Sequence, residues 1–184
     1  MFNSYNRDIN FPSAFTQESV KDNEKGIIYQ EQIDYLHISS SDRDLISYPS
    51  SHYYSIPLNN TFKNISKIEL IQATIPNVST TEPFVILKID ELDKTVFSLN
   101  RYIDNSFAII PFRPSTSNWI NLNCKEELIE KNFITPKSSL DKMTISLYTK
   151  NGTLFPFNNI DNDFVFKITT VQKSRSNINV HSIF

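Results

Sequence analysis

The chain has 184 residues, a formal net charge of −2 and a single cysteine, Cys124. This length allows one domain with its own core, and a lone cysteine excludes an internal disulfide and a cysteine-rich zinc site. The basic residues are dispersed, so we expect no direct contact with nucleic acid. We also expect no membrane span, because no apolar run approaches ~18 residues, and no secretory signal, because the N-terminus lacks its pattern.

Few residues offer chemistry. Only two glycines occur, Gly26 and Gly152, so glycine-rich phosphate-binding loops are absent and nucleotide chemistry of those kinds is not indicated. The histidines His37, His52 and His181 have no partner at metal-ligand spacing, so we expect structural roles for them and no bound metal or cofactor.

Residues 1–26 differ in character from the rest of the chain. They are polar and charged, with Phe2, Tyr5, Phe11 and Phe15 spaced through them. Such a segment cannot bury enough apolar surface to fold alone. Two interpretations stay open: a disordered tail, or an extended N-terminal arm whose four aromatic side chains form an interface with a neighbouring subunit and become ordered on assembly.

Patterns typical of strands begin after Gly26. Residues 27–38 alternate roughly and predict a first strand. Residues 52–58 predict a second, short strand, which Pro57 ends or places at a sheet edge. Residues 65–75 predict the strongest strand of the first half, which Pro76 and Asn77 terminate.

A tight charge cluster, Asp42, Arg43 and Asp44, lies between the first two predicted strands. These side chains could contact a cation or a phosphate. We favour a structural turn, in which the aspartates form Asx-type turns and an Arg43 salt bridge fixes the start of the next strand.

The middle of the chain predicts short strands at 84–89, 95–99, 107–112 and 119–122, the last with Trp119 facing inward. Residues 124–131 are the one segment with a helical pattern, and their charges indicate a solvated face. Cys124 would be a nucleophile only beside a histidine. Because no local sequence supports that pairing, we interpret Cys124 as a structural thiol and the chain as no enzyme.

The last third shows the clearest alternation. Residues 142–149 predict a half-buried strand. Asn151 and Gly152 then form the strongest short-range hairpin signal, a structural turn after which residues 154–157 are expected to pair back.

A polar segment and a final strand, predicted at 164–169, complete this third. Asp161, Asn162 and Asp163 superficially suggest calcium ligands. The glycine and distal glutamate of an EF-hand loop are missing, so a polar turn is favoured.

Roughly eight to ten short strands with almost no helix predict an all-β, antiparallel sandwich or barrel, and a single jelly roll fits this length. The expected organisation is an extended N-terminal arm at 1–26, a single jelly-roll domain at 27–173 and a C-terminal tail at 174–184.

The order of several segments is similar to that of a known family. Together they resemble the penton and minor capsid proteins (single jelly rolls) of nucleocytoplasmic large DNA viruses. The segments are Ser41–Asp44, Tyr48–Tyr53, Ile56–Leu58, Ile68–Asn77 (Ile-Glu-Leu-Ile-Gln-Ala-Thr-Ile-Pro-Asn), Leu140–Leu147, Asn151–Phe155 and Asp163–Ile168.

The resemblance implies a structural virion protein, foremost the penton subunit, made in the host cytoplasm and assembled as a homopentamer at the five-fold vertex. Its implied partners are the major capsid protein and other minor capsid proteins, with an internal viral membrane nearby. A cement protein beneath the capsid facets is the alternative within the family. Outside it, a carbohydrate- or receptor-binding β-sandwich with an aromatic platform around Trp119 or Tyr102 and, more remotely, a Cys124 hydrolase stay open.

Overall fold

The structure, a computed structural model, describes residues 27–78, 82–92, 95–112, 118–123 and 129–175. The chain divides into two compact units, one of residues 31–172 and the other of residues 1–30 with 173–184. The described residues are all-β apart from one 3-10 turn, η1 (Ser40–Asp42), which confirms the predicted class. The predicted interface residues Phe2, Tyr5, Phe11 and Phe15, together with Cys124 and His181, lie outside the described residues.

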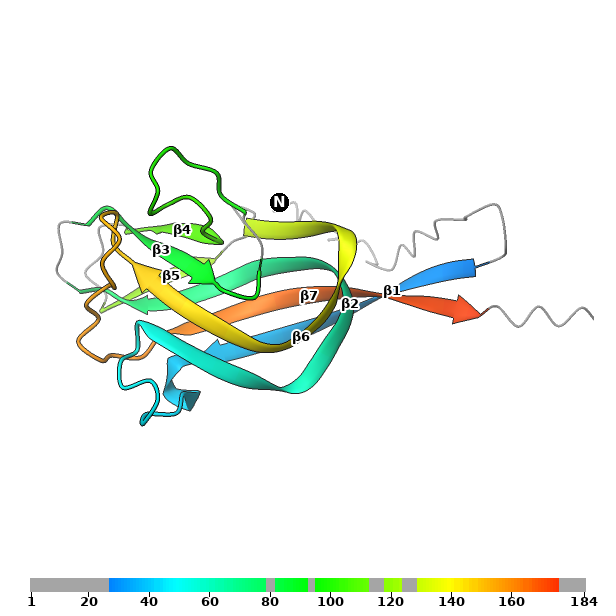
Figure 1. Cartoon of the computed structure of the whole chain (residues 1–184). Helices are drawn as coiled ribbons and strands as arrows, with labels where there is room; N and C mark the ends of the chain where they lie inside the picture. The colour runs from blue at the N-terminus through cyan, green and yellow to red at the C-terminus, as the bar shows by residue number, and fades with distance from the viewer. Residues whose placement is uncertain (1–26, 79–81, 93–94, 113–117, 124–128, 176–184) are drawn as a thin grey trace, which may run out of the picture. The chain divides into compact units, whose positions relative to one another are not determined.

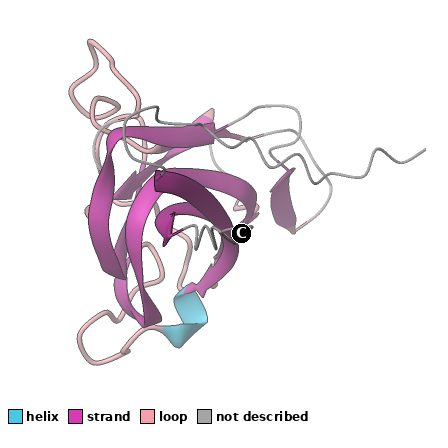
Figure 2. Ribbon diagram, turned by 90° about the vertical axis from the view of Figure 1, so that its right-hand side faces the viewer, coloured by secondary structure: helices cyan, strands magenta, loops and turns pink. Residues whose placement is uncertain are grey.

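The strands form a curled antiparallel sheet (Figures 1 and 2). Their order is β1-β7-β2-β6-β3-β4, and β5 also pairs with β2. The prediction of roughly eight to ten short strands does not fit the described ranges, because β2 and β6 extend over 24 and 20 residues. The strands are β1 (Ile27–Ser39), β2 (Tyr53–Pro76), β3 (Phe84–Ile89), β4 (Ala108–Pro111), β5 (Trp119–Asn123), β6 (Ile129–Tyr148) and β7 (Asp163–Arg175).

Strands β2 and β6 bend together through the sheet (Figure 1). Tyr53–Pro57 pairs with the later part of β6, and after two register irregularities residues 67–70 pair with its beginning. Asn64 lies in this bend with a φ of 53°, a left-handed conformation that asparagine tolerates well. The strands predicted separately at 52–58 and 65–75 are therefore parts of the single strand β2. Pro57 does not end it, because β6 is the only neighbour of this part among the described strands, and proline is tolerated at a sheet edge.

The later part of β2 has neighbours on both sides. It pairs with β7 on one side, and with β6 and then β5 on the other. The register to β7 shifts between Leu70 and Gln72. This irregularity lets Leu70 and Ala73 both face the core while Gln72 is exposed.

The core is built from buried apolar side chains of strands β1 to β7 and of the segments between them. It is rich in aromatic side chains, among which the rings of Phe155 and Phe157 stack with centroids 4.6 Å apart. Phe107 meets Phe166 edge-on at 6.1 Å. Alternate residues of β2, β6 and β7 fill the rest of this interior. Burial of this much apolar surface is what allows a chain without disulfides to fold.

Two sequence predictions about the middle of the chain are wrong. Trp119 does not face inward: its side chain is 39% exposed, because Ile120 and Leu122 take the core-facing positions of β5. No strand forms over the described residues of 95–99. The backbone N–H groups of Thr95 and Val96 both donate to Ser106 O, which closes a loop instead.

Two predictions about the later part also need correction. Of the predicted helical segment 124–131, the described residues 129–131 are strand and begin β6, which therefore starts long before the predicted 142. After the hairpin, only Leu154 forms a bridge, to Tyr148, and no strand covers 154–157. There the chain leaves the sheet so that Phe155 and Phe157 enter the core.

Candidate functional site

The described residues contain no group of three His, Cys, Asp or Glu side chains that could hold a metal ion. Within the same ranges, no helix has the length and apolarity needed to cross a bilayer. His37 lies at the surface, 3.3 Å from Asp163. His52 is partly buried; burial, and then the charge of Arg43, lower its pKa. The candidate sites among the described residues are therefore a buried polar cluster and the exposed surfaces around it.

Arg43 ties two distant parts of the chain together. Its side chain is 6% exposed, and its Nη1 donates to Asp161 Oδ1 at 2.7 Å and to Ser40 O. Its Nε donates to Tyr48 O at 3.0 Å. The sequence analysis expected a salt bridge at Arg43, and the structure places the partner, Asp161, 118 residues further along the chain. Arg43 thus joins the segment before β2 to the segment before β7.

Asn162 continues this cluster into the interior. It is fully buried; its Nδ2 donates to Ser51 O at 2.8 Å, and its Oδ1 accepts from Tyr54 Oη at 2.8 Å. Its backbone N–H donates to Ser40 Oγ at 2.9 Å. Burial, and then the charge of Asp163, raise the pKa of Tyr54 well above its usual value, so this phenol stays a neutral donor. We call Ser40, Arg43, Ser51, Tyr54, Asp161 and Asn162 the polar cluster.

The buried role of Asn162 was not predicted, because residues 161–163 have the composition of a polar turn. One signal was present. Asn162 has the same strand parity as Phe164 and Phe166, and all three side chains point inward. A polar residue in phase with a core-facing row must find buried hydrogen-bond partners.

Asp44 braces an exposed turn beside the polar cluster. Its Oδ1 accepts from Ile46 N at 3.0 Å and its Oδ2 from Ser47 Oγ at 2.6 Å, and these bonds, Ser47 first, lower the pKa of Asp44. Asp42 lies in η1 and is exposed. The side chains of Leu45 and Ile46 in this turn are exposed to solvent, that of Ile46 to 94%. We call Leu45 and Ile46 the apolar turn; its fixed backbone lowers the entropy cost of a contact made there.

A second pair of exposed apolar side chains lies on the loop between β3 and β4. Phe97 is 79% exposed and Leu99 is fully exposed. Side-chain acceptors brace this loop: Ser98 N donates to Asp104 Oδ1 at 3.3 Å, and Tyr102 N donates to Asn100 Oδ1 at 3.0 Å.

The turn at Asn151 and Gly152 packs against this loop. Thr149 N donates to Thr153 O at 2.8 Å and Gly152 N to Thr149 O at 3.0 Å, a type I turn followed by a glycine bulge. Gly152 has a φ of 81°, and an added Cβ would lie against the Tyr102 ring. The residues predicted as a structural turn therefore also form a contact with the neighbouring loop.

A half-buried charge cluster is centred on Glu69 of β2. Glu69 lies between the core residues Ile68 and Leu70 in β2 and points away from them, yet its side chain is only 10% exposed. Its Oε2 is 3.0 Å from Lys167 Nζ and 3.3 Å from Lys67 Nζ. Burial alone would raise the pKa of Glu69, but hydrogen bonds from Lys167 and Lys67 outweigh it and the pKa is lowered.

The Glu69 contacts predict a pH-dependent contribution to stability. A lowered pKa in the folded state means that the contribution is fully present above the usual glutamate pKa of 4.5 and is lost as pH falls through the lower folded value. We expect Glu69→Gln to reduce the free energy of unfolding by about 1 kcal/mol at neutral pH and by progressively less in acid. Urea denaturation of both proteins across this pH range measures the difference.

Glu130→Gln is the matched control, because Glu130 is more exposed and lies 3.7 Å from Lys67 Nζ. Its effect on the free energy of unfolding should be smaller at every pH. A Glu69→Gln effect that stayed constant from neutral to acidic pH would contradict the role of the carboxylate charge.

Part of the chain is similar to a known protein family. A family model, described as a family of unknown function (DUF5901), matches residues 28–79, less than a third of the chain. The matched segment runs along β1, η1, the apolar turn and β2. No curated protein sequence matches the chain.

Proposed function

We propose that this chain is a single jelly-roll capsid protein of a large icosahedral DNA virus, with the penton subunit as its specific role. The strand order is the observation that carries the jelly-roll part of this proposal. In a jelly roll, strands numbered along the chain pair as 1-8-3-6 in one sheet and 2-7-4-5 in the other. Here β1, β7, the later part of β2, and β5 are neighbours in that order.

The second half of the pattern is supported in the same way. The earlier part of β2 pairs with the later part of β6, β6 pairs with β3, and β3 pairs with β4. If the bend at Asn64 divides β2 into strands two and three, the seven observed strands supply the eight of a jelly roll. An up-and-down barrel would instead pair consecutive strands all the way round.

A fold alone does not give a function, so the role rests on two further observations. The first is the series of segments that resemble penton and minor capsid proteins. The second is the presence of two braced, exposed apolar sites, the apolar turn and the loop carrying Phe97 and Leu99. Identical subunits close a ring when two different patches meet at each contact, and these sites supply candidate patches.

The proposed partners follow from that role. Copies of this chain form a homopentamer at the five-fold vertex of the virion, and the major capsid protein and other minor capsid proteins surround it. The aromatic residues of the segment 1–26 are proposed to contact those neighbours.

The oligomeric state of the purified full chain tests this proposal. We expect native mass spectrometry to give the mass of five copies, and negative-stain images to show five-fold rings. Ile46→Asp should weaken assembly by about tenfold or more, because a charge would be desolvated at the contact. Ile46→Leu, which keeps the apolar surface, is the matched control and should assemble like the wild type.

Cryo-EM of the virion distinguishes a location of this chain at the five-fold vertices from a location beneath the capsid facets. Density for this chain at the five-fold positions is the expected result. A chain that stays monomeric and lies beneath the facets would exclude the penton role and favour a cement protein.

A further inference from the structure

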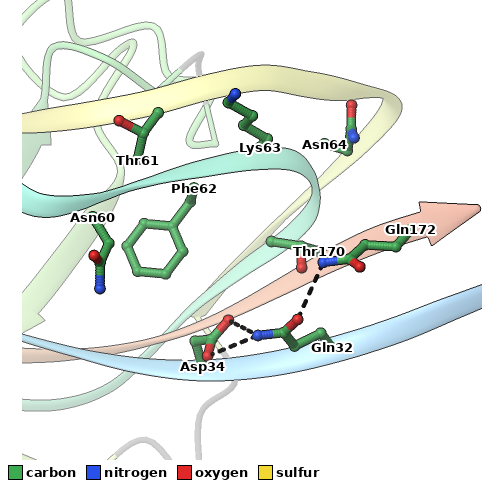
Figure 3. A pocket seen from close by; sticks show the side chains of 9 residues that line it. All are labelled: Gln32, Asp34, Asn60, Thr61, Phe62, Lys63, Asn64, Thr170 and Gln172. Carbon is green, nitrogen blue, oxygen red and sulfur yellow. Dashed lines mark hydrogen bonds between the residues drawn. The ribbon is translucent and has the colours of Figure 1, made fainter.

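An open groove lies among β1, the bend of β2, and β7, within the unit of residues 31–172 (Figure 3). Its volume is about 540 Å³, within the range of small-molecule sites. Gln32 and Asp34 of β1 form one wall, residues 60–64 of β2 face them, and Gln172 of β7 lies at one end. No part of the proposed assembly role uses this groove.

One wall of the groove is an ordered row of polar side chains. Gln172 Nε2 donates to Gln32 Oε1 at 3.2 Å, and Gln32 Nε2 donates to the two carboxylate oxygens of Asp34 at 3.1 and 3.3 Å. An ionised carboxylate only accepts, so Asp34 fixes which end of the Gln32 amide faces it. Each member keeps further hydrogen-bonding capacity beyond these bonds.

On the opposite wall, the Asn60 amide faces the same side as Phe62, whereas the Asn64 amide, at the bend of β2, points away from Asp34 (Figure 3). Asn60 and Asn64 are exposed, and neither side chain hydrogen-bonds to another described residue. Between them lies Phe62, half-buried, with one part of its ring against the core and the rest turned across the groove toward Asp34 (Figure 3). The groove therefore offers a row of bonded polar groups, the Asn60 amide, which has no partner among the described residues, and one aromatic ring.

We propose that this groove binds a short, neutral carbohydrate. Sugar hydroxyls both donate and accept, and amides with a carboxylate supply both kinds of partner. The negative face of an aromatic ring attracts the C–H groups on one side of a pyranose. The groove would hold about one to three sugar rings, given its volume.

Other ligand classes match the lining less well. Of the nine residues that line the groove, Lys63 is the one cation, and its side chain points away from Asp34 (Figure 3), so a phosphate or sulfate beside the Asp34 carboxylate is disfavoured. Phe62 is the one apolar residue among the nine, so a hydrophobic ligand or an apolar peptide side chain finds little surface.

Saturation-transfer NMR on the full chain tests the proposal, with methyl mannoside, N-acetylglucosamine, lactose and maltotriose as probes. We expect at least one probe to bind with a dissociation constant of about 1 mM. Gln32→Ala and Asn60→Ala should each weaken that binding about three- to tenfold, the effect of losing one or two hydrogen bonds. Phe62→Leu keeps an apolar contact with the core but removes the ring, and should also weaken binding.

Gln72→Ala is the matched control. Gln72 is an exposed glutamine of β2 outside the groove, and its loss should leave binding unchanged. Thermal unfolding of each variant shows that it is folded. Failure of all four neutral sugars to bind would overturn the proposal, as would equal binding by the wild type, Gln32→Ala and Asn60→Ala. Because the readout is sugar binding by the chain itself, the result is independent of whether the chain forms a ring.

Discussion

Asn162→Ala is expected to lower the free energy of unfolding by about 3 kcal/mol or more. The substitution removes the amide that bonds Tyr54 Oη and Ser51 O, each at 2.8 Å, and leaves both groups buried. A buried polar group without a partner costs about 1–3 kcal/mol, and two such groups are created here. Urea or guanidinium denaturation of the wild type and the variant measures the change.

Two further variants make this expectation specific. Tyr54→Phe removes the hydroxyl that donates to the Asn162 amide. The losses in free energy of unfolding caused by Tyr54→Phe and by Asn162→Ala should therefore sum to more than the loss in the double variant. Asn132→Ala is the matched control: Asn132 is exposed on β6, and its side chain bonds to no described residue except Glu130, so its effect should stay within about 0.5 kcal/mol. An Asn162→Ala effect as small as this control would mean that the polar cluster does not stabilise the fold.

Gly152→Ala is expected to cost about 2–4 kcal/mol, because two unfavourable terms act together. The φ of 81° at Gly152 strains any residue with a Cβ, and that Cβ would lie 2.1 Å from Tyr102 Cδ1. The ring of Tyr102 must therefore move, and with it the loop that carries Phe97 and Leu99. The change in unfolding midpoint measures the cost.

The same substitution in a Tyr102→Ala background separates the two terms. Without the ring there is no clash, so Gly152→Ala should then cost about 1 kcal/mol, the backbone strain alone. An equal cost in both backgrounds would show that the Tyr102 contact plays no part. Asn151→Ala, at the neighbouring exposed position without a positive φ, is the control for the turn sequence itself.

The sequence predicted the short apolar run at 84–89 and the alternating run at 164–169 as strands. Residues 84–89 and 164–169 became strands because apolar side chains fill every core-facing position. The full lengths of β2 and β6 could not be predicted, since their bends break the two-residue period while pairing resumes beyond them. Phe97 and Leu99 alternate as a strand would, but no neighbouring strand pairs with them, and period alone does not report a partner.

The same distinction applies to the sites: those encoded by adjacent residues could be predicted, and those formed by residues far apart in the sequence could not. The turn at Asn151 and Gly152 is encoded by two adjacent residues and was predicted correctly, but the returning strand at 154–157 was not, since only Leu154 forms a bridge there. The need for an Arg43 salt bridge was also visible locally, but Asp161 could not be named before the strands were placed. The groove was missed entirely, because Gln32, Asn60 and Gln172 come together only through the pairing of β1, β7 and β2.

The continuous strand β2 has a consequence for how the protein opens. It pairs with β5, β6 and β7, and its two parts take different neighbours on either side of one bend. Both parts pair with β6, so separating either part of β2 from β6 also disturbs the pairing of the other part. Partial opening therefore exposes few backbone amides, and the slowest hydrogen exchange in both parts of the sheet follows a single global event.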